Sequence, residues 1–239
     1  MESYFDYFIK NKFDYMGAWV DHYSDYGRGI FKASKWIKSN KLNHYIIRKN
    51  KLGHLRKIIY FFLRKIIISR YFIIIFNKFL FFFNKQNKKK QNFFNFYYPQ
   101  ENFLPYEKKI FNGGKINIQV LVKEENFKRF YKNLNSLCKY YGCESWWMGI
   151  KKHKFENYEH FFADNGYDLT LQWSKDFIFK KKVFLKRLAN FLKKNKVKIY
   201  LAQDSFFASY ILNEKSLIKI KKSIKINKKN NSLMYERLF

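Results

Sequence analysis

The pattern of apolar and polar positions is clearest between residues 115 and 201, where two periods alternate along the chain. Short segments rich in β-branched or aromatic residues predict β-strands, and the most regular of them alternates apolar with polar side chains. The predicted strands are Lys115–Val122, Glu144–Lys151, Tyr167–Trp173 and Val197–Leu201.

Two longer segments between these strands carry apolar residues at helical spacing. They are Glu124–Tyr141, which Gly142 is expected to end, and Asp176–Lys194. The order β-α-β-β-α-β is that of the split βαβ motif. We therefore predict an α+β fold, in which helices pack on one face of an antiparallel sheet.

The chain before residue 91 shows no such period. Residues 1–90 are aromatic, basic and irregular, with a turn expected over Ser24–Gly29. The polar, basic run Lys85–Gln91 predicts an exposed loop. We therefore expect two parts, an irregular or helical segment over residues 1–90 and an α+β domain over residues 91–239.

The segment Ile58–Phe83 is strongly apolar but is interrupted by four Arg and Lys residues. Its longest uncharged run, Tyr71–Asn77, is far shorter than the roughly 20 residues that span a bilayer. The sequence thus predicts no transmembrane helix, although a helix lying on a membrane surface stays possible. The N-terminus carries acidic residues among its aromatics and lacks the apolar core of a signal peptide, so we expect a cytoplasmic setting.

The net charge of +31 has two interpretations. A surface of that sign attracts nucleic acid, an anionic membrane or a phosphorylated substrate. A bias towards codons rich in A and T would also raise Lys, Asn, Ile and Phe together. Most aromatic residues occupy positions that the periods assign to a core, and no nucleic-acid-binding motif is found, which disfavours nucleic acid.

Sequence motifs for independent catalysis are missing. Cys138 and Cys143 have no second pair to complete a zinc site, although they could form a disulfide, and the His residues show no metal-binding spacing. No nucleophile motif and no glycine-rich phosphate loop is found. The sequence alone therefore predicts no metal and gives no specific chemistry.

Several short blocks nevertheless resemble, in order, the FAD-linked oxidases of the vanillyl-alcohol-oxidase type. Within that family, the blocks are most similar to the decaprenylphosphoryl-ribose 2-oxidases and the D-arabinono-1,4-lactone oxidases. The blocks are Gly17–Asp21 (GAWVD) with Gly27–Gly29 (GRG), Phe76–Leu80, Phe96–Glu101, Ile118–Phe127, Met148–Lys151, Gly166–Leu171, Ile199–Ser205 and Ser232–Leu238.

The resemblance covers the C-terminal, substrate-binding half of such enzymes, whose flavin-binding half has no counterpart here. It implies oxidation of a CH–OH group of a sugar, an aldonolactone or a polyprenyl-phosphate sugar, with hydride passing to FAD. FAD would be bound by a separate flavin-binding subunit. The alternatives are an inactive truncated relic, and a basic, non-enzymatic protein that binds nucleic acid or an anionic membrane surface.

The resemblance also implies a set of site residues. Lys151 and Gln203 fall at positions with a catalytic role. Gln203 stands where the family has lysine, which implies weakened or altered activity. The residues implied to bind substrate are Trp19, Tyr97, Asn117, Gln119, Asp168 and Thr170, of which Asn117 stands where close relatives have glutamine.

Overall fold

A computed structural model of the chain describes residues 10, 13–24, 27–37, 69–83, 114–153 and 165–200. The chain divides into two compact units. One unit is Met1–Lys115 with Ser174–Asp176, and the other is Ile116–Trp173 with Phe177–Phe239. The loop predicted at residues 85–91, and with it the predicted boundary near residue 90, lies outside the described residues.

In the first unit, two antiparallel strands are described. β1 (Tyr15–Val20) pairs along its whole length with β2 (Gly29–Ser34). Gly29 permits this close approach, because a Cβ atom at that position would lie 2.7 Å from the carbonyl oxygen of Trp19. No period in the sequence predicted either strand.

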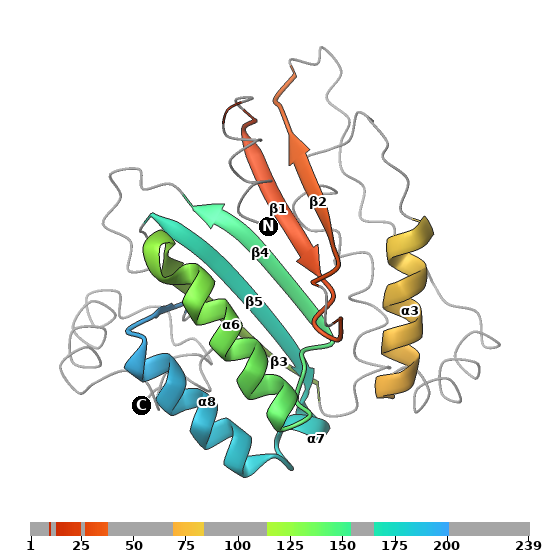
Figure 1. Ribbon diagram of the computed structural model, residues 1–239, viewed down its shortest axis with the longest axis vertical. Coiled ribbons are helices and arrows are strands. Elements are labelled where there is room, and N and C mark those ends of the chain that lie inside the picture. Colours follow the sequence, from red (N-terminus) through yellow and green to blue (C-terminus); the bar gives the residue numbers. More distant parts are fainter. Residues whose placement is uncertain are drawn as a thin grey trace, which may run out of the picture. The chain divides into compact units, whose positions relative to one another are not determined.

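The first unit also contains the helix α3 (Arg70–Phe83), which lies within the strongly apolar segment of the sequence (Figure 1). At 1.5 Å per residue its 14 residues extend about 21 Å, less than the roughly 30 Å of a bilayer's hydrocarbon core. Across the described ranges, no helix is long and apolar enough to cross a membrane.

The second unit confirms the predicted α+β fold. Its strands lie in the order β4-β5-β3-β6, with β4 antiparallel to β5 and β3 antiparallel to β6. Figure 1 shows α6 and α8 side by side over one face of this sheet. The elements are, in chain order, β3 (Lys115–Lys123), α6 (Glu124–Tyr140), β4 (Trp147–His153), β5 (Gly166–Ser174), α7 (Lys175–Ile178), α8 (Lys182–Lys194) and β6 (Lys198–Ile199).

The core of this unit lies between the helices and the sheet. In each strand every second residue points to the helices, and nearly all of these residues are apolar, as the two-residue period of a strand requires. Tyr167 of β5 stacks on Phe127 of α6 with ring centroids 4.3 Å apart, and Trp173 meets Phe184 of α8 edge to face at 6.0 Å. The fully buried members include Ile118, Val120, Met148, Ile150, Leu169, Leu171, Leu134 and Leu188.

The helix α6 ends as its sequence predicted. Gly142 adopts a positive φ of 59°, a conformation that glycine takes at little cost. The N–H of Cys143 donates to the carbonyl oxygen of Cys138 at 2.8 Å, and the N–H of Gly142 to that of Lys139 at 3.0 Å. This pair of bonds is a Schellman motif, which satisfies carbonyls that the helix end would leave unpaired.

The single helix predicted over residues 176–194 is wrong in one respect, since the structure breaks it into α7 and α8. Ile178 and Phe184 are both fully buried, yet side chains six residues apart on one continuous helix would point about 120° away from each other. The break lets both face the core. It also leaves Phe177 and Val183, two members of the predicted apolar stripe, exposed.

Candidate polar site on the sheet

The face of the sheet opposite the helices is polar. In each strand, residues alternate between the two faces of the sheet. The strand neighbours of Ile118, Leu169 and Ile150, which point to the helices, therefore lie on this opposite face. The polar residues that share it include Asn117 and Gln119 of β3, Lys151 and His153 of β4, and Asp168, Thr170 and Gln172 of β5. Three strands therefore bring together residues that are far apart in the sequence.

At the centre of this face lies Asp168, whose exposed fraction is only 1%. Gln119 donates from Nε2 to Asp168 Oδ2 at 2.6 Å. The imidazole Nε2 of His153 lies 3.4 Å from the same oxygen. We call Gln119, His153 and Asp168 the polar cluster.

The other carboxylate oxygen, Asp168 Oδ1, is buried and accepts no hydrogen bond from any residue that the structure describes. Asn117 Oδ1, on the same face of β3, is in the same situation within the described ranges. A buried acceptor without a donor costs about 1–3 kcal/mol, and more when it is charged. Two such oxygens on one face of the sheet mark a place where the hydrogen-bond donors of a ligand would find acceptors.

The pairing of β4 with β5 fixes the positions of two further residues. Lys151 lies directly opposite Asp168, and Thr170 lies opposite Gly149. Lys151 is half-buried and contributes positive charge to the same face. A cation, an anion and neutral amides are thus combined within a few residues of each other on the sheet.

Five of the residues implied by the resemblance therefore share one face, namely Asn117, Gln119, Lys151, Asp168 and Thr170. Trp19 belongs to the first unit, where it is buried in β1. Tyr97 and Gln203 lie outside the described residues.

His153 was not among the residues predicted from the sequence. It lies two positions beyond Lys151, so the period of β4 places both on the same face. Its partner across the strand pair is Gly166, which has no side chain, and His153 reaches diagonally to Asp168. The two-residue spacing from Lys151 was the only signal for His153 in the sequence. That His153 lies near Asp168 follows from the register between β4 and β5, which the spacing does not give.

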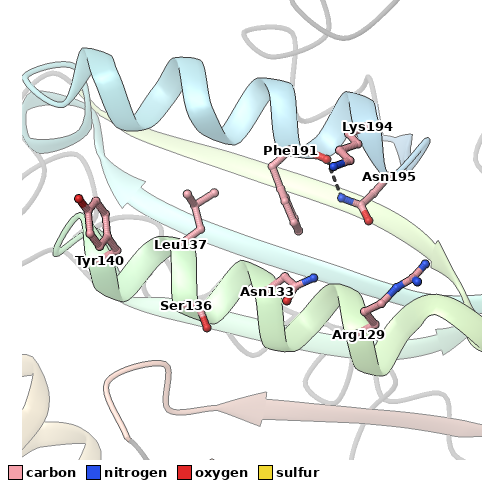
Figure 2. Close-up of a pocket in the computed structure, with 8 residues that line it drawn as sticks. All are labelled: Arg129, Asn133, Ser136, Leu137, Tyr140, Phe191, Lys194 and Asn195. Atoms are coloured by element: carbon pink, nitrogen blue, oxygen red, sulfur yellow. Dashed lines mark hydrogen bonds between the residues drawn. The ribbon is translucent and has the colours of Figure 1, made fainter.

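The opposite side of the unit carries a groove between α6 and α8. Its lining includes Arg129, Tyr140 and Phe191, and Asn195 Nδ2 donates to the carbonyl oxygen of Phe191 at 2.8 Å (Figure 2). None of the residues implied by the resemblance lines this groove. The helices and the apolar core therefore separate it from the polar cluster.

No group of three metal-ligating residues is found within the described ranges. Cys138 and Cys143 are both free and buried. Burial raises the pKa of the Cys138 thiol far above its ordinary value, and the neighbouring Cys143 and Glu144 add to this effect. Burial also raises the pKa of Cys143, to about 11, although Lys181 partly opposes the increase. Both thiols are consequently protonated and poor nucleophiles near neutral pH.

The described residues do not fit the diphosphate of FAD. Such a group needs closely approaching backbone amides, usually in a glycine-rich turn before a helix. Gly29 and Gly166 instead pack against neighbouring strands, and a Cβ at Gly166 would clash with the carbonyl oxygen of Val122. α6 begins at Glu124 directly after Lys123, with no glycine between strand and helix.

Comparison with known proteins adds no family to this picture: no family model matches the chain, and no curated protein matches it.

Proposed function

We propose that the second unit is the substrate-binding half of an FAD-dependent sugar oxidoreductase. The observation that carries the proposal is the polar cluster, in which a buried carboxylate retains an oxygen with no donor among the described residues. The resemblance to FAD-linked oxidases supports the same assignment, because four of its implied substrate-binding residues and the implied catalytic Lys151 lie on this face.

A pair of neighbouring sugar hydroxyls suits the cluster chemically. One hydroxyl would donate to Asp168 Oδ1 and so supply the bond that this oxygen lacks. Gln119 uses its amide nitrogen for Asp168 Oδ2, which leaves its Oε1 to accept from a second hydroxyl. A site that uses fixed polar groups in this way discriminates strongly against analogues that lack the hydroxyls.

Lys151 is placed to bind the charged or electron-rich part of the substrate. Its position opposite Asp168 puts an ammonium group beside the proposed hydroxyl site. It would stabilise negative charge on a lactone oxygen or on the phosphate of a polyprenyl-phosphate sugar.

His153 is the group in the cluster that would hold a proton. A neutral imidazole can accept the proton of a substrate hydroxyl, and Asp168 would then stabilise the imidazolium that forms. Its side chain is 34% exposed, whereas that of Asp168 is 1% exposed. The histidine can therefore exchange protons with water while the carboxylate orients it.

We assign FAD itself to a flavin-binding half outside this sequence, because the described residues do not fit its diphosphate. This chain would bind and orient the sugar, in a reducing cytoplasmic setting that suits its two free thiols. Gln203, in place of the lysine expected from the resemblance, would lower activity because an amide carries no charge.

The test is binding of D-arabinono-1,4-lactone to the purified chain, which saturation-transfer NMR measures. We expect binding by the wild type and at least a tenfold loss of affinity in Gln119→Leu and in Asp168→Asn. Glu125→Gln, on the exposed surface of α6, is the matched control and should bind as the wild type does. Equal binding by all four proteins, or no binding by any, would overturn the proposed sugar site.

The assignment of FAD has its own readout. The purified chain should be colourless, and should not acquire a flavin absorbance spectrum after incubation with FAD and gel filtration. A yellow protein with stoichiometric flavin would contradict the assignment of FAD to another half, whatever the outcome of the sugar titration.

A further inference from the structure

The helix α3 exposes far more apolar side chains than an ordinary surface helix does. Its one buried residue is polar, Asn77, with 4% of its surface exposed. Most of its large apolar side chains are exposed, Tyr71 by 80% and Phe82 by 75%, and the remaining ones are half-buried. Helices on the surface of a globular protein normally bury the apolar side and expose the polar one.

A hydrogen-bond network fixes which side of α3 faces inward. Asn77 Nδ2 donates to Asp21 Oδ1 at 2.8 Å, and Asp21 is itself buried. Arg28 forms an ion pair with Asp21 Oδ2, also at 2.8 Å. The backbone N–H of Tyr23 donates to Asp21 Oδ1 at 3.2 Å. Rotating the helix to bury its aromatic residues would break the bond from Asn77 and leave a buried carboxylate short of a donor.

Opposite Asn77, the exposed residues form a continuous apolar stripe. Tyr71, Ile75, Phe79 and Phe82 follow one another at helical spacing, and all are exposed. Phe83 stacks on Phe79 with ring centroids 5.8 Å apart. We call these five residues the aromatic stripe.

A lipid surface fits this stripe in both chemistry and charge. α3 contains no acidic residue, and its charged residues are Arg70 and Lys78. Aromatic side chains with neighbouring cations are typical of helices that lie in the headgroup region of a membrane. The net charge of +31 on the chain adds long-range attraction to anionic lipid.

We propose that the aromatic stripe of α3 docks on an anionic lipid surface, with the helix axis in the plane of the membrane. The helix is too short to cross a bilayer, so its apolar side chains enter the interface while Asn77 keeps it attached to its own unit. The proposal is independent of the sugar site, because its residues and contacts all lie in the first unit.

Co-sedimentation with lipid vesicles tests the docking. The wild-type chain should bind vesicles of phosphatidylcholine that contain roughly 30–40% of the anionic lipid phosphatidylglycerol, and it should bind much less to phosphatidylcholine alone. Binding to the anionic vesicles should fall as salt is raised, because salt screens the charges.

The decisive variant is Phe79→Ser with Phe82→Ser, and its control is Tyr140→Ser, which removes a still more exposed aromatic residue from α6. We expect at least a tenfold loss of vesicle binding in the double variant and no loss in the control. Thermal melting should match the wild type in both, since the substituted side chains are exposed.

Three outcomes would overturn the proposal. The first is equal vesicle binding by the double variant and the wild type. The second is failure of the wild type to bind anionic vesicles. The third is self-association, measured by analytical ultracentrifugation without lipid, that the double variant abolishes, because the stripe would then be an interface between copies of the chain.

Discussion

The two faces of the sheet in the second unit follow the same alternation but differ in what they bury. The helix-covered face contains apolar side chains such as Leu171 and Ile150, which have no exposed surface, and neither has Leu134 of α6 above it. The opposite face buries the amide of Gln119 and the carboxylate of Asp168, whose Oδ1 accepts no hydrogen bond from the described residues. The first face stabilises the fold, whereas the second keeps polar groups buried at a cost, as binding sites commonly do.

The largest expected effect is a loss of stability on the apolar face. Leu134→Ala should lower the free energy of unfolding by about 2–5 kcal/mol, since it removes buried methyl groups and leaves a cavity between α6 and the sheet. Urea denaturation followed by circular dichroism measures this change. A loss below about 1 kcal/mol would mean that this face is not close-packed, and the contrast between the faces would fail.

A smaller effect is expected on the polar face. Gln119→Leu removes the amide that donates to Asp168 Oδ2 and should lower the free energy of unfolding by about 1–3 kcal/mol, because the carboxylate loses a donor. The double variant Gln119→Leu, Asp168→Leu should recover much of that loss, since it removes both the donor and the buried carboxylate of this hydrogen bond. Failure of the double variant to recover stability would show that the polar pair itself holds the sheet together.

The sequence predicted the second unit well because its periods report burial directly. β3, α6 and β5 begin and end within two residues of the predicted bounds, as each has a single clear apolar face and Gly142 ends α6. β4 begins later than predicted, at Trp147, because the hydroxyl of Ser145 bonds to the backbone of Gln172, accepting from its N–H at 2.8 Å.

The parts that were not predicted depend on contacts distant in the sequence. β1 and β2 show no alternation of apolar and polar residues, and the close approach of Gly29 to Trp19 is a contact that no sequence period reports. The polar cluster joins Gln119 and Asp168 across 49 positions. The alternation of apolar and polar residues shows that both residues face away from the helices. It does not show whether that face is buried, because a solvent-exposed face has the same alternation.

A pH-dependent effect is expected next, on the helix-covered side. The pKa of Cys143 is raised from 9.0 to about 11, chiefly by burial, so the folded thiol holds its proton where the unfolded thiol loses it. This contribution to stability is complete below about pH 9 and is lost as the pH rises to 11. Urea denaturation at pH 8 to 11 should show a steeper decline for the wild type than for Cys143→Ser. Parallel declines would exclude this role for the thiol.

The smallest effect is expected where the helix-covered face meets solvent. Lys152 Nζ lies 2.5 Å from Glu124 Oε1 and over the ring of Tyr167. Burial lowers the pKa of Lys152, but the hydrogen bond to Glu124 and the nearby Tyr167 outweigh it, so the pKa is raised overall. Half of the Glu124 side chain is exposed, and water therefore screens the pair.

For this pair, Glu124→Gln should change the free energy of unfolding by less than about 1 kcal/mol, and addition of salt should reduce the difference further. Glu125→Gln, one position along α6 and also exposed, is the control for the loss of a negative charge near the start of a helix. Urea denaturation of both variants at low and high salt measures the two effects. A loss of unfolding free energy several times larger in Glu124→Gln than in Glu125→Gln would mean that an ion pair at the edge contributes as much as the polar cluster. Stability would then not be concentrated on the apolar face.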